Sequence, residues 1–136
     1  KGVAWALEEA GFALRGWNGV IAGDVPVGAG LSSSAALEMA TARAFAAVSG
    51  LAWDPTAMAL LGQRAENDWV GVNCGIMDQM ISAAGRRDHA LLLDCRSLEY
   101  DLVPLPAGTA FVIAGDFNAD GTVTQRKLGR KDNEFS

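Results

Sequence analysis

The sequence predicts one domain of mixed α/β class, with helices and strands packed in two layers (α+β). Segments whose apolar residues have helical spacing follow one another along the chain and are interrupted by short runs typical of strands. Half of the 136 residues are hydrophobic (50%) and 20% are charged, a balance typical of a folded domain. The length fits one domain or a part of one. Together these observations favour a two-layer α+β architecture.

The first elements are a helix and a strand. Residues 1–11 carry apolar side chains at helical spacing, and Gly11 is positioned to end that helix as a C-cap. Residues 17–25 (WNGVIAGDV) are predicted to form a strand, because they are rich in apolar residues and are followed by a glycine- and serine-rich loop.

Two longer helices follow. The alanine-rich segment 31–48 predicts the first of them, and residues 54–67 predict the second. Asp54 can act as the N-cap of the second helix, and Pro55 suits its first turn because proline has no N–H to leave unpaired there.

The rest of the chain predicts a short helix and three strands. A glycine-punctuated loop leads into an apolar helix within residues 70–86, and residues 89–106 predict two strands joined near Arg96. Residues 110–115 predict a third strand. We therefore expect a domain over residues 1–115 and a divergent polar tail, disordered or chimeric, over 116–136.

Charge and composition exclude several function classes. A net charge of −5 and a pI near 4.7 argue against nucleic-acid and anionic membrane surfaces, which need clustered lysine and arginine. Apolar runs are too short for a membrane span, and no signal peptide is visible. Cys74 and Cys95 lie in unlike contexts, so we expect reduced thiols and a cytoplasmic protein.

A glycine-rich and serine-rich loop precedes the helix at 31–48. Gly28 and Gly30 let the backbone turn, and Leu31 with three serines, Ser32, Ser33 and Ser34, opens the helix. The unpaired N–H groups and the helix dipole at such an end favour an anion such as phosphate. No lysine follows the glycines, so this is not a Walker-type loop. The alternative is a plain turn with capping serines, but three serines leave hydroxyls over for a ligand or Mg²⁺.

Two carboxylates stand out. Asp78 lies among apolar residues in CGIMDQ, and it is either a functional acid or simply an aspartate at a helix start. Glu66 lies near the end of the helix at 54–67, where the dipole disfavours a negative charge. Either another group compensates its charge, or it is a solvated acid paired with Arg64 or another neighbour.

The motifs resemble those of a known family. PVGAGLSSSAALE resembles the second signature of the GHMP kinases, and GVNCGIMDQ with the later DCRSLE is similar to the galactokinase family within them. The resemblance extends over roughly residues 1–113. It implies a ribosomal protein S5 domain 2-like fold, namely part of a GHMP kinase N-terminal domain.

This resemblance also implies a reaction and its residues. It implies ATP and Mg²⁺ as cofactors, and transfer of the γ-phosphate to the C1 hydroxyl of galactose. Asp78 would be the catalytic aspartate that faces this hydroxyl, and Gly75 would approach the sugar through its backbone N–H. Glu66 and Ser34 would hold Mg²⁺, with Ser33 as the alternative serine. The nucleotide would lie on Gly28, Gly30, Leu31, Ser32, Ser33 and Ser34.

The family's first and third signatures are absent from this sequence, so the chain matches about the middle third of a galactokinase. We therefore expect the isolated chain to be weakly active or inactive. Because sheet edges and apolar faces would be uncovered, we also expect it either to behave poorly alone or to self-associate. A non-catalytic regulator that senses sugar and ATP on the same fold is the alternative.

The tail carries a separate signal. Asp116, Asn118, Asp120 and Gly121 follow the D-x-N-x-D-G pattern of the first half of a calcium loop. Lys127 stands at the twelfth position, where a carboxylate belongs. The pattern therefore indicates a weak calcium-binding module or an Asx-rich turn.

Overall fold

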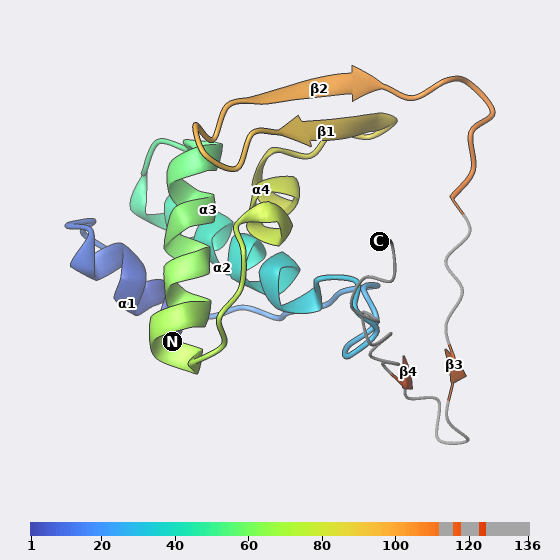
Figure 1. The fold of residues 1–136 in the computed structure, drawn as a ribbon. Coiled ribbons are helices and arrows are strands. Elements are labelled where there is room, and N and C mark those ends of the chain that lie inside the picture. Colours follow the sequence, from blue (N-terminus) through green and yellow to red (C-terminus); the bar gives the residue numbers. More distant parts are fainter. Residues whose placement is uncertain (112–115, 118–122, 125–136) are drawn as a thin grey trace, which may run out of the picture.

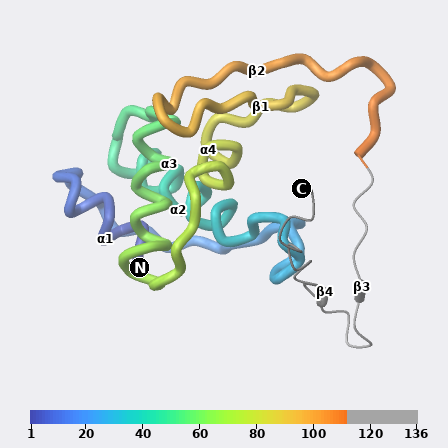
Figure 2. The backbone as a smooth tube through the Cα atoms, in the orientation of Figure 1, coloured from blue at the N-terminus to red at the C-terminus, as the bar shows by residue number. Residues whose placement is uncertain are grey.

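The computed structural model describes residues 1–111 and the backbone of two short segments, 116–117 and 123–124. In residues 1–111, a layer of helices carries a β-hairpin on one side (Figures 1 and 2). The elements, in chain order, are α1 (Gly2–Glu9), α2 (Ser33–Ser49), α3 (Pro55–Arg64), a π-helix η1 (Ala65–Val70), α4 (Met77–Ala84), β1 (His89–Leu93) and β2 (Tyr100–Pro104). The prediction of mixed helices and strands is confirmed.

The first helix ends as its sequence predicts. Gly11 has the left-handed φ of 89°, which glycine adopts without a steric penalty. Its N–H donates to the Glu8 carbonyl at 2.9 Å, and the Phe12 N–H donates to the Leu7 carbonyl at 3.1 Å. These two bonds form a Schellman motif, which satisfies carbonyls that the end of a helix leaves unpaired.

The predicted start of α3 is also confirmed. The Asp54 carboxylate accepts hydrogen bonds from the N–H groups of Thr56 at 2.9 Å and Ala57 at 3.1 Å, and Pro55 occupies the first turn. The α-helix ends earlier than the sequence indicated, at Arg64, and continues without a break as the wider π-helix η1.

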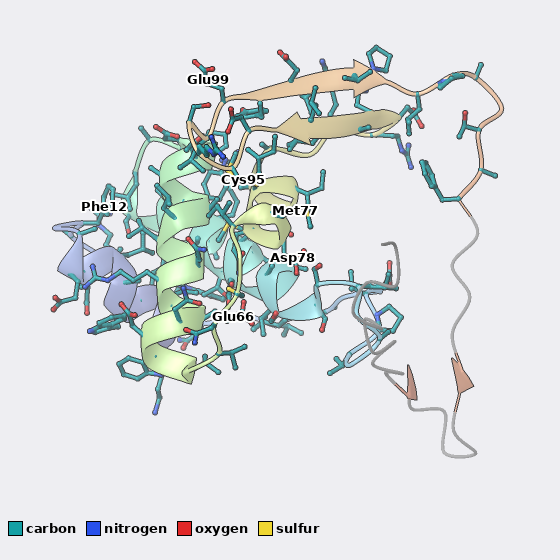
Figure 3. The ribbon with its side chains drawn as sticks, viewed as in Figure 1. Phe12, Glu66, Met77, Asp78, Cys95 and Glu99 are labelled. Carbon is teal, nitrogen blue, oxygen red and sulfur yellow. The ribbon has the colours of Figure 1, made fainter. Side chains whose placement is uncertain are left out.

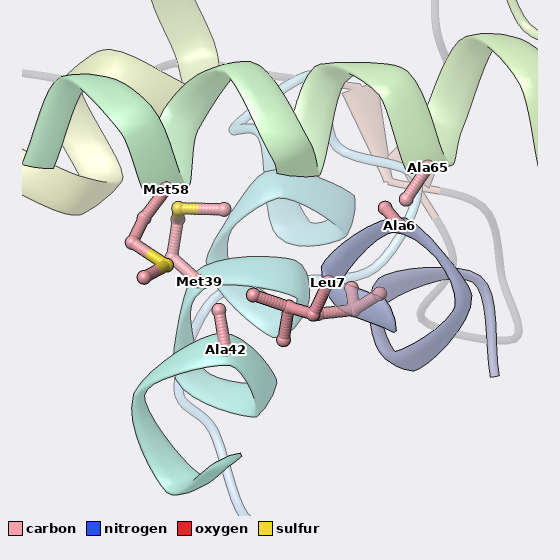
Figure 4. Packing of buried hydrophobic residues seen from close by; sticks show 7 residues of the cluster. Ala6, Leu7, Met39, Ala42, Met58 and Ala65 are labelled. Carbon is pink, nitrogen blue, oxygen red and sulfur yellow. The ribbon is translucent and has the colours of Figure 1, made fainter. Parts of the chain in front are cut away.

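A cluster of small and flexible side chains joins α1, α2, α3 and η1 (Figure 4). Its buried members are Val3, Ala6, Leu7, Met39, Ala42, Met58 and Ala65. Gly62 of α3 is buried against α2, where an added Cβ would collide with the methyl group of Met39. Alanine, glycine and methionine therefore let the helices approach closely.

The hairpin covers the α3 and α4 side of the helices. β1 and β2 are antiparallel, with Leu91 opposite Leu102, which confirms the two strands predicted over residues 89–106. A second buried cluster joins the layers: Ala59, Ile76 and Met80 pack against Leu93, Leu98 and Tyr100.

The strand predicted at residues 17–25 is wrong. None of these residues belongs to a strand, and the side chains of Val20 and Ile21 are 96% and 66% exposed. A strand exists only as part of a hydrogen-bonded ladder. No described segment runs beside residues 17–25 as a partner strand, so the apolar pattern alone does not produce one.

Most of residues 110–136 lie outside the described residues. The strand predicted at 110–115, the calcium pattern and the divergent tail fall there, apart from two short strands, β3 (Asp116–Phe117) and β4 (Val123–Thr124), which pair antiparallel. None of the helices that the structure describes is both long and apolar enough to cross a membrane.

Leu7 tests the helical core. Its side chain is fully buried, so Leu7→Ala should lower the free energy of unfolding by about 2–5 kcal/mol through lost burial and a cavity. Leu92→Ala is the matched control, because the same change at a side chain that is 66% exposed should cost less than about 1 kcal/mol. Urea unfolding followed by circular dichroism measures both, and equal costs would contradict this packing.

Candidate functional site

A buried polar cluster lies where α2, η1 and α4 meet. The Gln79 side chain is fully buried, and its Nε2 donates hydrogen bonds to Glu66 Oε2 at 2.8 Å and Glu38 Oε2 at 3.1 Å. Glu66 itself is only 9% exposed. One amide therefore links two carboxylates, one from α2 and one from η1.

The local backbone explains how these polar groups become buried. In the wider π-helix η1, two consecutive residues, Ala65 and Glu66, are buried. π-Helical turns are frequent at functional sites. On α4, Gln79 precedes the buried Met80, on the side of the helix that packs against α2 and α3.

The loop between η1 and α4 is tied to the same cluster. The Cys74 carbonyl accepts a hydrogen bond from Gln63 Nε2 at 3.1 Å, and the Cys74 N–H donates to Asn67 Oδ1 at 2.9 Å. The adjacent Gly75 is exposed, and a Cβ there would meet no described atom within 4 Å. Neither a positive φ nor packing against the described residues requires glycine at this position.

Two groups next to Glu66, the Glu38 carboxyl and the Cys74 thiol, have raised pKa values. Burial raises the pKa of Glu38; the Gln79 hydrogen bond opposes this increase, and repulsion from Glu66 adds to it. Burial also raises the pKa of the Cys74 thiol, and the neighbouring Glu66 carboxylate raises it further. Burial and the Glu66 carboxylate therefore disfavour a second negative charge on these neighbours.

A cavity of about 410 Å³ opens beside the cluster. Ser34 from the first turn of α2, Glu38 and Glu66 line it together with apolar residues of α1 and of the 17–25 segment. Among the three consecutive serines, Ser34 is the one that lines this cavity, while Ser32 and Ser33 do not. The structure thus brings together the serine and the glutamate that the sequence singled out as a pair.

The start of α2 is a tight turn. Gly28, Gly30 and Ser32 have positive φ values of 75°, 69° and 59°. Ser32 is the N-cap, but its side chain makes no capping hydrogen bond. A capping side chain needs an extended N-cap backbone, whereas Ser32 is left-handed, so the alternative of capping serines is wrong. No described side chain accepts from the first N–H groups of α2.

Asp78 lies in the first turn of α4 and is half-buried. Ile76 is the N-cap of that helix, so Asp78 does not cap it, and no described residue donates a hydrogen bond to its carboxylate. In Figure 3 the labels of Asp78 and Glu66 lie below α4, away from the hairpin. Asp78 does not line the cavity that Ser34 and Glu66 share.

The alternative of a solvated Glu66 paired with Arg64 is wrong. Arg64 instead lies 3.4 Å from Asp68 and 4.0 Å from Glu9, and its guanidinium stacks over the Trp5 ring at 4.9 Å from the centroid. Among the described residues, Glu66 is compensated by the neutral amide of Gln79 and not by a cationic side chain.

The sequence analysis missed Glu38, Gln79, Gln63 and Asn67. Two signals were present: Glu38 is the one acid within the alanine-rich α2, and Gln79 is a polar residue beside the apolar side chains of a short helix. Buried positions rarely hold such residues unless they are paired.

The residues at the cavity fit a divalent cation only in part. Across the described ranges, no group of three or more histidine, cysteine, aspartate or glutamate side chains could hold a metal ion. The Glu66 carboxylate and Ser34 hydroxyl are hard oxygen donors, which suit Mg²⁺. Because Mg²⁺ commonly takes one or two protein ligands together with phosphate and water, the pair fits an ion that arrives with a phosphate.

Comparison with known proteins identifies the family. Residues 1–86 match the GHMP kinases N terminal domain. The chain belongs to the GHMP kinases. It is 56% identical over 113 residues to a galactokinase of Roseiflexus sp. (strain RS-1), a match that covers 83% of this chain and 29% of the relative.

A solved structure agrees with this assignment. The crystal structure of Lactococcus lactis galactokinase complexed with galactose superposes with a TM-score of 0.66 and 34% sequence identity. The match covers 76% of this chain and 27% of that one. The chain spans less than a third of the length of both galactokinases, so its fold is part of the GHMP kinase N-terminal domain.

The two thiols should react at different rates. A higher pKa leaves less thiolate at a given pH, so at pH 8 Cys74 should react with a disulfide reagent more slowly than the exposed Cys95. The variants Cys95→Ser and Cys74→Ser isolate the two rates. Unfolding in guanidinium should remove the difference, and equal rates in the folded chain would show that Cys74 is not shielded.

Proposed function

We propose that this chain is the phosphate-binding and metal-binding part of a galactokinase. The complete enzyme transfers the γ-phosphate of ATP to the C1 hydroxyl of galactose. One observation carries the proposal: Ser34 and Glu66 line one cavity at the start of a helix whose first N–H groups have no capping side chain. The family membership and the similarity to galactokinases support the choice of reaction.

The nucleotide phosphates bind at the start of α2. Gly28 and Gly30 form the turn, and the N–H groups after Ser32, with the positive end of the helix dipole, attract the phosphate oxygens. Leu31 and the Ser32 and Ser33 hydroxyls complete this surface. The loop contains no lysine and the chain has a net charge of −5, so little positive side-chain charge is available for the phosphates. Backbone N–H donors are therefore important.

Ser34 and Glu66 would hold Mg²⁺ beside these phosphates. When bound, the ion supplies positive charge that offsets the charge on the transferring phosphoryl group. This chain contributes one carboxylate and one hydroxyl, so the phosphates and water complete the coordination.

Asp78 handles the sugar hydroxyl. Its carboxylate is half-buried and accepts no hydrogen bond from any described residue, which leaves it free to accept one from an alcohol. As the C1 oxygen bonds to the γ-phosphorus, the bond to ADP breaks, and the hydroxyl proton passes to Asp78 or to water. The exposed Gly75 lets the sugar approach the backbone, since no side chain stands there.

Turnover of the complete gene product that contains this sequence tests the proposal. With MgATP and galactose, a coupled assay should detect ADP release, and Asp78→Asn should reduce kcat by about 10²- to 10⁴-fold because the carboxylate is lost. Asp68→Asn, at an exposed acid paired with Arg64, is the control and should retain full activity.

Two outcomes would contradict this assignment. Full activity of Asp78→Asn would remove Asp78 from the reaction. ATP binding without galactose-dependent ADP release would favour the regulator that senses sugar and ATP. The 136-residue chain alone, which covers 29% of the Roseiflexus galactokinase, should turn over far more slowly than the complete product.

A further inference from the structure

The amide of Gln79 has no role in the reaction described above, yet it is fully buried at the centre of the polar cluster. Nε2 carries two hydrogens, and the two shortest contacts of this nitrogen go to two different carboxylates, Glu66 at 2.8 Å and Glu38 at 3.1 Å. Both acids line the cavity. The amide therefore lies directly behind the carboxylate that faces a ligand.

The orientation of this amide is fixed. Carboxylates accept hydrogen bonds, so the NH₂ end must face Glu38 and Glu66, and a flipped amide would place Oε1 against two negative groups. Gln79 Oε1 has no hydrogen-bond partner among the described residues, so the carboxylates, rather than a partner for the oxygen, determine the orientation.

We propose that Gln79 is a positioning residue that holds the Glu66 carboxylate toward the cavity for a divalent cation bound with a nucleotide. This inference rests on the function proposed above. Hydrogen bonds to a metal-binding carboxylate orient it and limit its rotation, and the loss of such a partner commonly weakens metal affinity 10- to 100-fold.

The second carboxylate strengthens the argument. Glu66 is buried and Glu38 is partly buried, and two anions at one site repel each other. The NH₂ group, with a hydrogen for each acid, keeps them apart and in defined directions. Without it, Glu66 would lose its donor and turn away from Glu38, out of its position in the cavity lining.

Cation binding by two matched variants tests the proposal. Gln79→Met removes the amide and keeps an unbranched side chain of similar length. Gln63→Met makes the same change at an amide that donates to the Cys74 carbonyl and to neither acid. The probe is Mn²⁺, titrated into the 136-residue chain with a saturating non-hydrolysable ATP analogue, and free Mn²⁺ is read by electron paramagnetic resonance.

Gln79→Met should weaken Mn²⁺ binding at least 10-fold, while the affinity for the analogue without metal stays within twofold of the unmodified chain. Gln63→Met should leave both affinities within twofold. A merely structural role would lower thermal stability in both variants without separating the metal from the nucleotide. Equal Mn²⁺ affinity in Gln79→Met and the unmodified chain would overturn the proposal.

The unmodified chain supplies a second measurement if Gln79→Met does not fold. The side-chain amide signals of Gln79 in a ¹⁵N spectrum should shift on addition of Mg²⁺ with the analogue, and more than those of Gln63. No shift at Gln79 while the analogue binds in a Mg²⁺-dependent way would overturn the positioning role alone. Absence of any Mg²⁺-dependent binding would overturn the metal site of the proposed function with it.

Discussion

The hydrogen bonds from one buried amide to two carboxylates are the constraint on which the arrangement of the helices depends. Glu38 comes from α2, Glu66 from η1 and Gln79 from α4. A shift of η1 or α4 would leave the buried Glu66 carboxylate without its donor, and a shift of α2 would do the same to the partly buried Glu38. An unpaired buried carboxylate costs several kcal/mol, more than most single apolar contacts provide. Because of this cost, the three elements have one specific relative placement, whereas apolar packing alone would allow several placements.

The apolar core brings the helices close together but does little to fix their positions along one another. It is built largely from alanine and methionine, and methionine adapts to irregular spaces, so its contacts tolerate small shifts of one helix along another. Gly62 and the alanines of α2 bring the helices near enough for side chains of ordinary length to meet across them. The polar cluster then selects one arrangement, and the cavity with Ser34 at its edge follows from that arrangement.

What the sequence predicts correctly is local. Asp54 and Gly11 act on N–H and carbonyl groups within five residues of themselves, so their roles can be inferred from neighbours in the chain. The dipole argument for Glu66 was also local, and it correctly indicated that this acid needs compensation. The compensating amide of Gln79 lies 13 residues after Glu66, and the second acceptor of this amide, Glu38, lies 41 residues before Gln79. No local pattern specifies such distant partners. The failed strand at 17–25 has the same cause, because its existence depends on a distant partner.

Asp78 and Gln79 are consecutive residues of α4, and this adjacency connects the two halves of the proposed chemistry. Side chains at successive positions of an α-helix point about 100° apart, so one turn of α4 presents an amide to the buried acids and a carboxylate to a different, half-exposed side. The hydrogen bonds of the Gln79 side chain fix the rotation of α4 and its position along α2 and η1. The rotation of α4 in turn sets the direction of Asp78. Any displacement of Gln79 from Glu66 therefore also moves Asp78, so one element positions both the carboxylate proposed for the sugar and the carboxylate proposed for the cation.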